Sequence, residues 1–307
     1  MSSDSPRHDD VDEFSFLAPQ AADLGTEVPP ARRLALSLPD GRSLSAVALG
    51  EGAPAVVLLH GAGLNAHTWD ATALALGAPT LAIDLPGHGD SSWRDDAAYA
   101  PRVLAPDVIR GIEEWAEAPV VLVGQSLGGA TAAAVAAARP DLVRAVVLVD
   151  ITPGIDESGP AELRRFYERL SFASREELLD HVVAFGLGGG REQARRGVVL
   201  NSRVLPDGTV EWKHHFARIA ASALAPAARD DDGESWADLE AVRAPLTLVR
   251  GTRGFVSAAA LDTFRSRLPH ADVVELEAPH NVQEVAPVEL AALIRSPLSS
   301  PAPESVA

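Results

Sequence analysis

One serine stands in a sequence context that suits nucleophilic chemistry. Residues 120–129 read Val-Val-Leu-Val-Gly-Gln-Ser-Leu-Gly-Gly, an apolar run rich in β-branched side chains followed by Gly-x-Ser-x-Gly. A serine hydroxyl is a poor nucleophile at neutral pH, so an enzyme that uses one holds it on a tight strand-to-helix turn near a general base. Gly124 and Gly128 leave room for that turn. The pattern predicts Ser126 as a covalent nucleophile, with the N-terminus of the next helix beside the developing oxyanion.

The same stretch has a second reading as a membrane helix. Residues 119–138 are nearly free of polar side chains, and about 20 apolar residues suffice to span a bilayer. However, Gly124, Gln125 and Ser126 interrupt the run, and its two halves differ: β-branched residues precede the break and alanines follow it. We interpret the segment as a strand followed by a helix.

Short apolar strands alternate with helical patterns along much of the chain. We expect a hairpin at 34–38 and 44–49, further strands at 55–59, 80–83, 145–149, 245–249 and 273–276, and helices near 105–116 and 287–294. Unbroken apolar strands alternating with helices indicate an α/β fold, with a mostly parallel sheet flanked by helices and buried on both faces.

The character of the sequence changes between its segments, which predicts a domain organisation. Residues 153–236 are rich in arginine, glutamate and helical patterning, and we interpret them as an inserted helical cap. The sheet core is expected at 31–152 and 237–295. Residues 1–30 read as a flexible acidic leader and 296–307 as a flexible tail.

Composition narrows the function classes. The chain has 307 residues, a net charge of −17 and no cysteine. An acidic chain is a poor nucleic-acid binder, because binding requires a basic face. Without cysteine there is no disulfide or thiolate metal site, and the adjacent His214 and His215 do not share a helix face as metal ligands would. The acidic first residues lack a signal-peptide pattern, which predicts a cytoplasmic protein.

Four motifs stand in order along the chain, each at an expected strand end: His60-Gly61, the segment Asp84-Leu85-Pro86-Gly87-His88-Gly89-Asp90-Ser91, the Ser126 motif, and Pro279-His280. In this order they resemble the α/β-hydrolase fold superfamily, in its serine-nucleophile, cap-bearing, esterase-like branch. The resemblance covers roughly residues 34–294.

The resemblance implies a catalytic triad with Ser126 as nucleophile and His280 as general base. The commonest family pattern places the acid just after the strand at 246–249, but residues 250–257 contain no carboxylate. Some members carry the acid one strand earlier, which is the position of Asp150. We therefore expect Asp150 to orient His280; Asp262, or no acid at all, remains the alternative.

Other site residues follow from the same resemblance. Backbone N–H groups of Ala62 and Leu127 would form the oxyanion hole. Phe166, Phe185 and Trp212 are candidates for contact with substrate, although their spacing also suits packing of the cap onto the core. Trp69 is a comparable candidate because it lies near an expected strand-end loop. No metal and no cofactor are expected.

The predicted activity is hydrolysis of small, fairly apolar carboxylic esters through an acyl-enzyme. A serine nucleophile excludes haloalkane dehalogenase chemistry and most epoxide hydrolase chemistry, both of which use a carboxylate. One alternative is a carbon–carbon bond hydrolase of ring-cleavage diketones, although its Gly-Pro-Gly-like oxyanion loop is absent from residues 60–65. Another is a weakly catalytic ligand-binding protein on the same fold, suggested by the unusual segment 250–253. We expect the protein to bind a small-molecule substrate and to bind neither nucleic acid nor membrane. Whether it forms a homodimer is left open.

Overall fold

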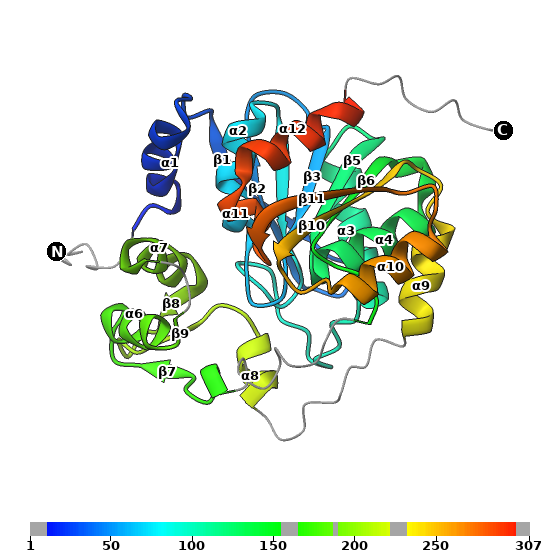
Figure 1. The fold of residues 1–307 in the computed structure, drawn as a ribbon. Helices are drawn as coiled ribbons and strands as arrows, with labels where there is room; N and C mark the ends of the chain where they lie inside the picture. Colours follow the sequence, from blue (N-terminus) through cyan, green and yellow to red (C-terminus); the bar gives the residue numbers. More distant parts are fainter. Residues whose placement is uncertain (1–10, 155–164, 187–189, 222–231, 299–307) are drawn as a thin grey trace.

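The structure is a computed structural model that describes residues 11–154, 165–186, 190–221 and 232–298 (Figure 1). Its centre is an eight-stranded sheet in the order β1-β2-β4-β3-β5-β6-β10-β11. The strands are β1 (Ala31–Ser37), β2 (Ser43–Leu49), β3 (Val56–Leu59), β4 (Thr80–Asp84), β5 (Val120–Gln125), β6 (Val143–Val149), β10 (Leu246–Arg253) and β11 (Asp272–Pro279).

The sheet is parallel from β4 to β11, and β2 pairs antiparallel with both β1 and β4. The predicted hairpin is confirmed as β1 and β2. Every residue of β3, β4 and β5 is buried, since helices cover both faces and each face needs an apolar side chain. The carboxyl ends of the parallel strands meet at one edge, where ligands bind in open α/β sheets.

Two helical layers enclose the sheet (Figure 1). One face packs against α3 (Pro101–Trp115), α4 (Leu127–Ala138), α9 (Asp232–Ala241) and α10 (Ala258–Arg267). The other packs against α1 (Leu17–Leu24), α2 (Asp70–Leu76), α11 (Val282–Val285) and α12 (Pro287–Leu298). Alternate strand residues supply the two cores: Val57 and Leu59 face the first layer, whereas Val56 and Leu58 face the second. Short 3₁₀ turns η1 (Glu13–Phe16), η2 (Ala66–Trp69) and η3 (Pro140–Leu142) join these elements.

The insertion after β6 contains a small sheet that the sequence did not predict. Its helices are α6 (Arg175–Ala184), α7 (Arg191–Asn201) and α8 (Phe216–Ala221), and its antiparallel strands β7 (Ser171–Phe172), β8 (Ser202–Val204) and β9 (Val210–Trp212) run in the order β7-β9-β8. Strands of two or three residues are too short to show an alternating pattern. The core also resumes earlier than residue 237, because α9 starts at Asp232 and packs against α4.

The N-terminal segment is more ordered than the flexible leader expected over residues 1–30. Residues 13–24 form η1 and α1, Leu17 and Ala21 are buried in the core, and Glu13 pairs with Arg33 at the start of the sheet. Residues 1–10 lie outside the described part. At the other end, α12 continues to Leu298, three residues into the expected tail. In the described ranges, no helix combines the length and apolar character needed to cross a bilayer.

Candidate active site

Ser126 sits alone between β5 and α4 in a backbone conformation that side-chain-bearing residues rarely adopt. Its φ is 51° and its ψ is −122°, which costs about 1–3 kcal/mol for a residue other than glycine. The Ser126 N–H donates to the Val149 carbonyl at 3.1 Å. The strained turn is thereby tied to the end of the neighbouring strand β6.

The flanking glycines allow three chain segments to approach closely. A Cβ atom on Gly124 would lie 2.2 Å from the Gly128 carbonyl oxygen, and one on Gly128 would lie 2.3 Å from the Leu59 carbonyl oxygen. Real Cβ contacts are never that short, so no side chain fits at either position. The turn predicted from Gly-x-Ser-x-Gly is present, and its glycines are needed for close packing.

His280 and Asp150 meet at the same edge of the sheet. His280 follows β11 and Asp150 follows β6, and His280 Nδ1 lies 2.7 Å from Asp150 Oδ2. Asp150 is fully buried. A carboxylate only accepts hydrogen bonds, so the proton of this bond belongs to Nδ1, and Nε2 is left as the basic nitrogen.

The end of β10 and the turn that follows it carry no acid but wrap the carboxylate of Asp150. The Gly251 N–H donates to Oδ1 at 3.1 Å, and the Phe255 N–H donates to Oδ2 at 2.7 Å. A Cβ atom on Gly254 would lie 2.1 Å from Oδ2, so only glycine lets the loop close this tightly. Asp262, the alternative acid, is exposed on α10.

The nucleophile and the His280 loop lie beside each other. The Gln125 Nε2 donates to the His280 carbonyl at 3.4 Å and to Asn281 Oδ1 at 3.5 Å. Within the described residues no hydrogen bond joins Ser126 Oγ to His280. Such bonds are often long in ligand-free enzymes and tighten when substrate binds.

The loop after β3 lies against the nucleophile. A Cβ atom on Gly61 would lie 3.2 Å from Ser126 Cβ. His60 Nε2 accepts the Leu85 N–H at 2.9 Å, so its Nδ1 carries the proton and donates to the Gly61 carbonyl at 2.8 Å. Burial lowers the pKa of His60 to about 4, which keeps the ring neutral in this role.

The two predicted oxyanion donors, Ala62 and Leu127, directly follow Gly61 and Ser126. Because C=O and N–H point in opposite directions across a trans peptide, the bond from His60 to the Gly61 carbonyl turns the Ala62 N–H away from His60. Ala62 is exposed. Leu127 is the first residue of α4, so its N–H has no partner within the helix.

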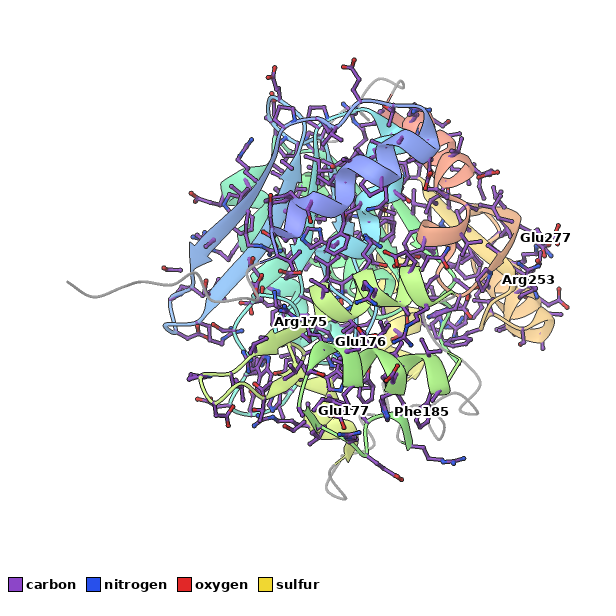
Figure 2. All side chains as sticks on the ribbon, turned by 90° about the vertical axis from the view of Figure 1, so that its left-hand side faces the viewer. Arg175, Glu176, Glu177, Phe185, Arg253 and Glu277 are labelled. Carbon is purple, nitrogen blue, oxygen red and sulfur yellow. The ribbon has the colours of Figure 1, made fainter. Side chains whose placement is uncertain are left out.

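The four candidate substrate contacts lie in different surroundings. Phe166 and Trp212 are buried in the aromatic core of the cap, with ring centroids 5.3 Å apart. Phe185 ends α6 on the cap surface and is 39% exposed (Figure 2). Trp69 is fully buried in the core between the sheet and α2. The expectation for Trp69 therefore needs correcting: it is a packing residue, because the turn of η2 directs it inward.

Two residues near the site were missed by the sequence reasoning. The Tyr167 hydroxyl would lie 2.9 Å from a Cβ atom on Gly63, so this cap residue contacts the oxyanion loop. The Phe255 ring stacks on His280 with centroids 3.9 Å apart. The only sequence signal for Phe255 was its position within the acid-free segment 250–257, and Tyr167 carried none beyond its place in the cap.

Charged side chains hold the cap and the N-terminal segment on the core. Arg196 of α7 pairs with Asp70 at 3.0 Å, and Asp70 also pairs with His67 at 3.0 Å. His67 lies 3.1 Å from Glu13, which pairs with Arg33. Burial alone would lower the pKa of His67, but the charge of Asp70 and hydrogen bonds to Asp70 and Glu13 outweigh it and raise the pKa to about 9.

Three buried histidines line the boundary between core loops and cap. The His88 ring lies 5.1 Å from His60 and 6.1 Å from His214. Burial lowers the pKa of His88 to about 3 and that of His214 well below its usual value. In the described part of the chain, no cluster of three or more His, Asp or Glu side chains could hold a metal ion.

Comparison with known proteins finds relatives of this chain among the alpha/beta hydrolases. A family model described as the alpha/beta hydrolase family matches residues 56–293. The esterase Rv0045c of Mycobacterium tuberculosis is 35% identical over 304 residues, covering 94% of this chain and 97% of that protein. A solved structure of that esterase gives a TM-score of 0.78 at 35% identity and covers 95% of this chain and 100% of the other.

A second relative is named for the compound that it hydrolyses. The 2-(acetamidomethylene)succinate hydrolase of Mesorhizobium japonicum is 31% identical over 248 residues, covering 76% of this chain and 84% of that protein. A solved structure of such a hydrolase gives a TM-score of 0.76 at 26% identity, covering 88% of this chain and 100% of the other. The fold class and family resemblance expected from the sequence are confirmed: the chain belongs to the alpha/beta hydrolase family.

Proposed function

We propose that this protein is a serine esterase that uses Ser126, His280 and Asp150 as a catalytic triad. The observation that carries the proposal is the 2.7 Å bond between His280 Nδ1 and the buried Asp150, formed beside a serine on a strained turn. The name of the M. tuberculosis relative, an esterase, supports the same reaction class.

The triad geometry supports a two-step reaction. His280 Nε2 takes the proton of Ser126 Oγ as the oxygen attacks the ester carbonyl, and the N–H groups of Ala62 and Leu127 stabilise the oxyanion. His280 then protonates the alcohol as it departs, and the acyl group remains bonded to Ser126 Oγ as an ester. Water, deprotonated by the same nitrogen, hydrolyses that ester and releases the acid.

The surroundings of the serine favour an apolar substrate of modest size. A mostly apolar depression lies beside the first turns of α4, which follows Ser126. It is lined by Gly129, Ala130, Ala133, Leu148, Ile151, Thr152, Pro153, Ser235 and Leu239, of which Thr152 and Ser235 bear hydroxyl groups. Among the described residues that line it, none carries a charged side chain. The aromatic core of the cap reaches the oxyanion loop through Tyr167, whose hydroxyl lies against Gly63.

The intact bond between His280 and Asp150 also speaks against a weakly catalytic binding protein, which would be expected to carry a degraded triad. Segment 250–253 suggested that alternative, yet Gly251 within it and Phe255 just after it each donate a backbone hydrogen bond to Asp150.

A series of p-nitrophenyl esters from acetate to decanoate tests the proposal. We expect the wild-type protein to hydrolyse the short esters fastest, and Ser126→Ala to lower kcat by about 10⁴-fold or more. A folded wild-type protein that hydrolyses none of these esters, or a Ser126→Ala variant as active as wild type, would contradict the proposal.

A further inference from the structure

Phe255 contacts two members of the proposed triad, Asp150 through its backbone and His280 through its ring. Its backbone N–H donates to Asp150 Oδ2 at 2.7 Å, the same oxygen that bonds His280 Nδ1. Its ring lies over the His280 ring with centroids 3.9 Å apart and planes 17° apart. One residue of the acid-free loop therefore holds the acid and covers the base.

Burial of the Phe255 ring does not explain this arrangement, because the residue remains 50% exposed. The loop is fixed on both sides of it. The Gly254 N–H donates to the Gly251 carbonyl at 2.9 Å, and the Arg250 Nε donates to the Val256 carbonyl at 2.7 Å. Val256 itself is buried, so the backbone is anchored while the ring stays at the surface above His280.

The stacking geometry favours one charge state of His280. Two neutral aromatic rings prefer offset or edge-to-face contacts with centroids about 4.5–7 Å apart, because their negative faces repel each other. A close, nearly parallel stack is instead favourable when one ring is a cation. His280 becomes an imidazolium when it takes the proton of Ser126.

We propose that Phe255 is a positioning residue that orients His280 toward Asp150 and stabilises its protonated form during catalysis. This inference rests on the proposed esterase function. The proton passes from Ser126 Oγ to His280 Nε2, the serine oxygen bonds the ester carbon, and the positive charge develops on the ring that faces Phe255. Asp150 stabilises the same charge from the Nδ1 side.

The other charged groups near His280 have partners of their own. Arg253, the last residue of β10, pairs with Glu277 at 3.4 Å, and Figure 2 shows the two together at the edge of the molecule. Arg250 pairs with Glu275 at 2.5 Å. From α11, Glu284 accepts hydrogen bonds from Thr68 and Asn281, and from β5 the nearest side chain is the neutral Gln125. A substitution of Phe255 leaves all of these in place.

The test compares Phe255→Leu, which removes the π face, with Phe255→Trp, which restores a stronger one. For Phe255→Leu we expect kcat to fall about 2- to 30-fold with little change in KM, the range set by the strength of a cation–π contact. The acidic limb of kcat/KM, which reports protonation of His280, shifts to lower pH. Phe255→Trp restores both values. Val288→Ala, a change at another exposed apolar residue, serves as the control and leaves them unchanged.

Two further measurements separate the possible failures. Circular dichroism and thermal melting establish that each variant is folded, and the low-field NMR signal of the His280 Nδ1 proton reports its bond to Asp150. An unmoved acidic limb, or an equal loss of kcat in the Leu and Trp variants, overturns the role of Phe255 even if wild-type Ser126 reacts with a fluorophosphonate. Lack of reaction at wild-type Ser126 overturns the proposed function itself, and this inference with it.

Discussion

Gly254→Ala is expected to disable the site without changing any member of the triad. The added Cβ atom would lie 2.1 Å from Asp150 Oδ2 and 2.4 Å from its Cγ, whereas carbon atoms in ordinary contact are about 3.5–4.0 Å apart. The φ of Gly254 does not lie in the left-handed region, so the alanine itself is not strained. Relief of the clash must therefore move the Asp150 carboxylate or the loop by about 1 Å or more.

The structure sets the expected size of the effect. A misplacement of about 1 Å in a catalytic constellation costs about 10²-fold in rate, and loss of the acid's function costs about 10⁴-fold. We expect Gly254→Ala to lower kcat/KM by a factor between these limits, or about 2.7–5.4 kcal/mol of transition-state stabilisation. Asp150→Asn should mark the upper limit.

The assay is hydrolysis of a short p-nitrophenyl ester, with thermal melting to show that each variant is folded. Gly197→Ala is the matched control, because a Cβ atom at this position of helix α7 meets nothing within 4 Å. It should keep full activity and gain up to about 1 kcal/mol of stability. A folded Gly254→Ala protein with activity within about threefold of wild type, less than the 10²-fold expected for misplacement, would refute the assignment of Asp150 as the acid held by this loop.

Three further changes test the backbone strain at Ser126, the ion pairs of His67 and the packing of helix α1. The free energy of unfolding of Ser126→Gly, measured with urea, should exceed that of Ser126→Ala by about 1–3 kcal/mol, because glycine adopts the positive φ without strain. Equal stability of the two variants would contradict the strain at this position. The pKa of His67 is raised to about 9 and that of Glu13 lowered to about 2, where burial alone would raise the latter but hydrogen bonds from His67 and Arg33 prevail. These two groups stabilise the fold fully between pH 4.5 and 6.5, with up to about 3 kcal/mol from His67. The contribution of His67 declines as the pH rises toward 9, and that of Glu13 declines as the pH falls toward 2. Urea unfolding at a series of pH values measures both, and His67→Gln should flatten the alkaline decline. Leu17→Ala should cost about 2–5 kcal/mol in the same unfolding assay, whereas a loosely attached leader would show no change.

Features encoded in short stretches of sequence were predictable. The apolar strands, the β1–β2 hairpin and the turn at Ser126 each depend on residues close together in the chain. Asp150 was predicted from the family resemblance, because some members carry the acid at the end of the strand equivalent to β6, where Asp150 follows an apolar run.

Features that depend on contacts between distant segments were not predictable. The N-terminal segment looked disordered from composition, yet Glu13 finds Arg33 and His67, and Leu17 finds the core. Trp69 was a candidate for substrate contact because it lies near a strand-end loop, but at the end of η2 it is buried in the core. The acid-free segment 250–257 suggested that the triad acid was missing. Its backbone instead donates hydrogen bonds to Asp150, an acid supplied by another strand.

The most direct test of the account is reaction of the protein with a fluorophosphonate, read out by intact mass and peptide mapping. The wild type, Ser126→Ala, His280→Ala and Asp150→Asn proteins are treated in parallel. We expect a single adduct on Ser126 in the wild type, no adduct in Ser126→Ala, and strongly slowed labelling in the other two variants. A folded wild-type protein that acquires no adduct on Ser126 would contradict the central claim that this serine is an activated nucleophile.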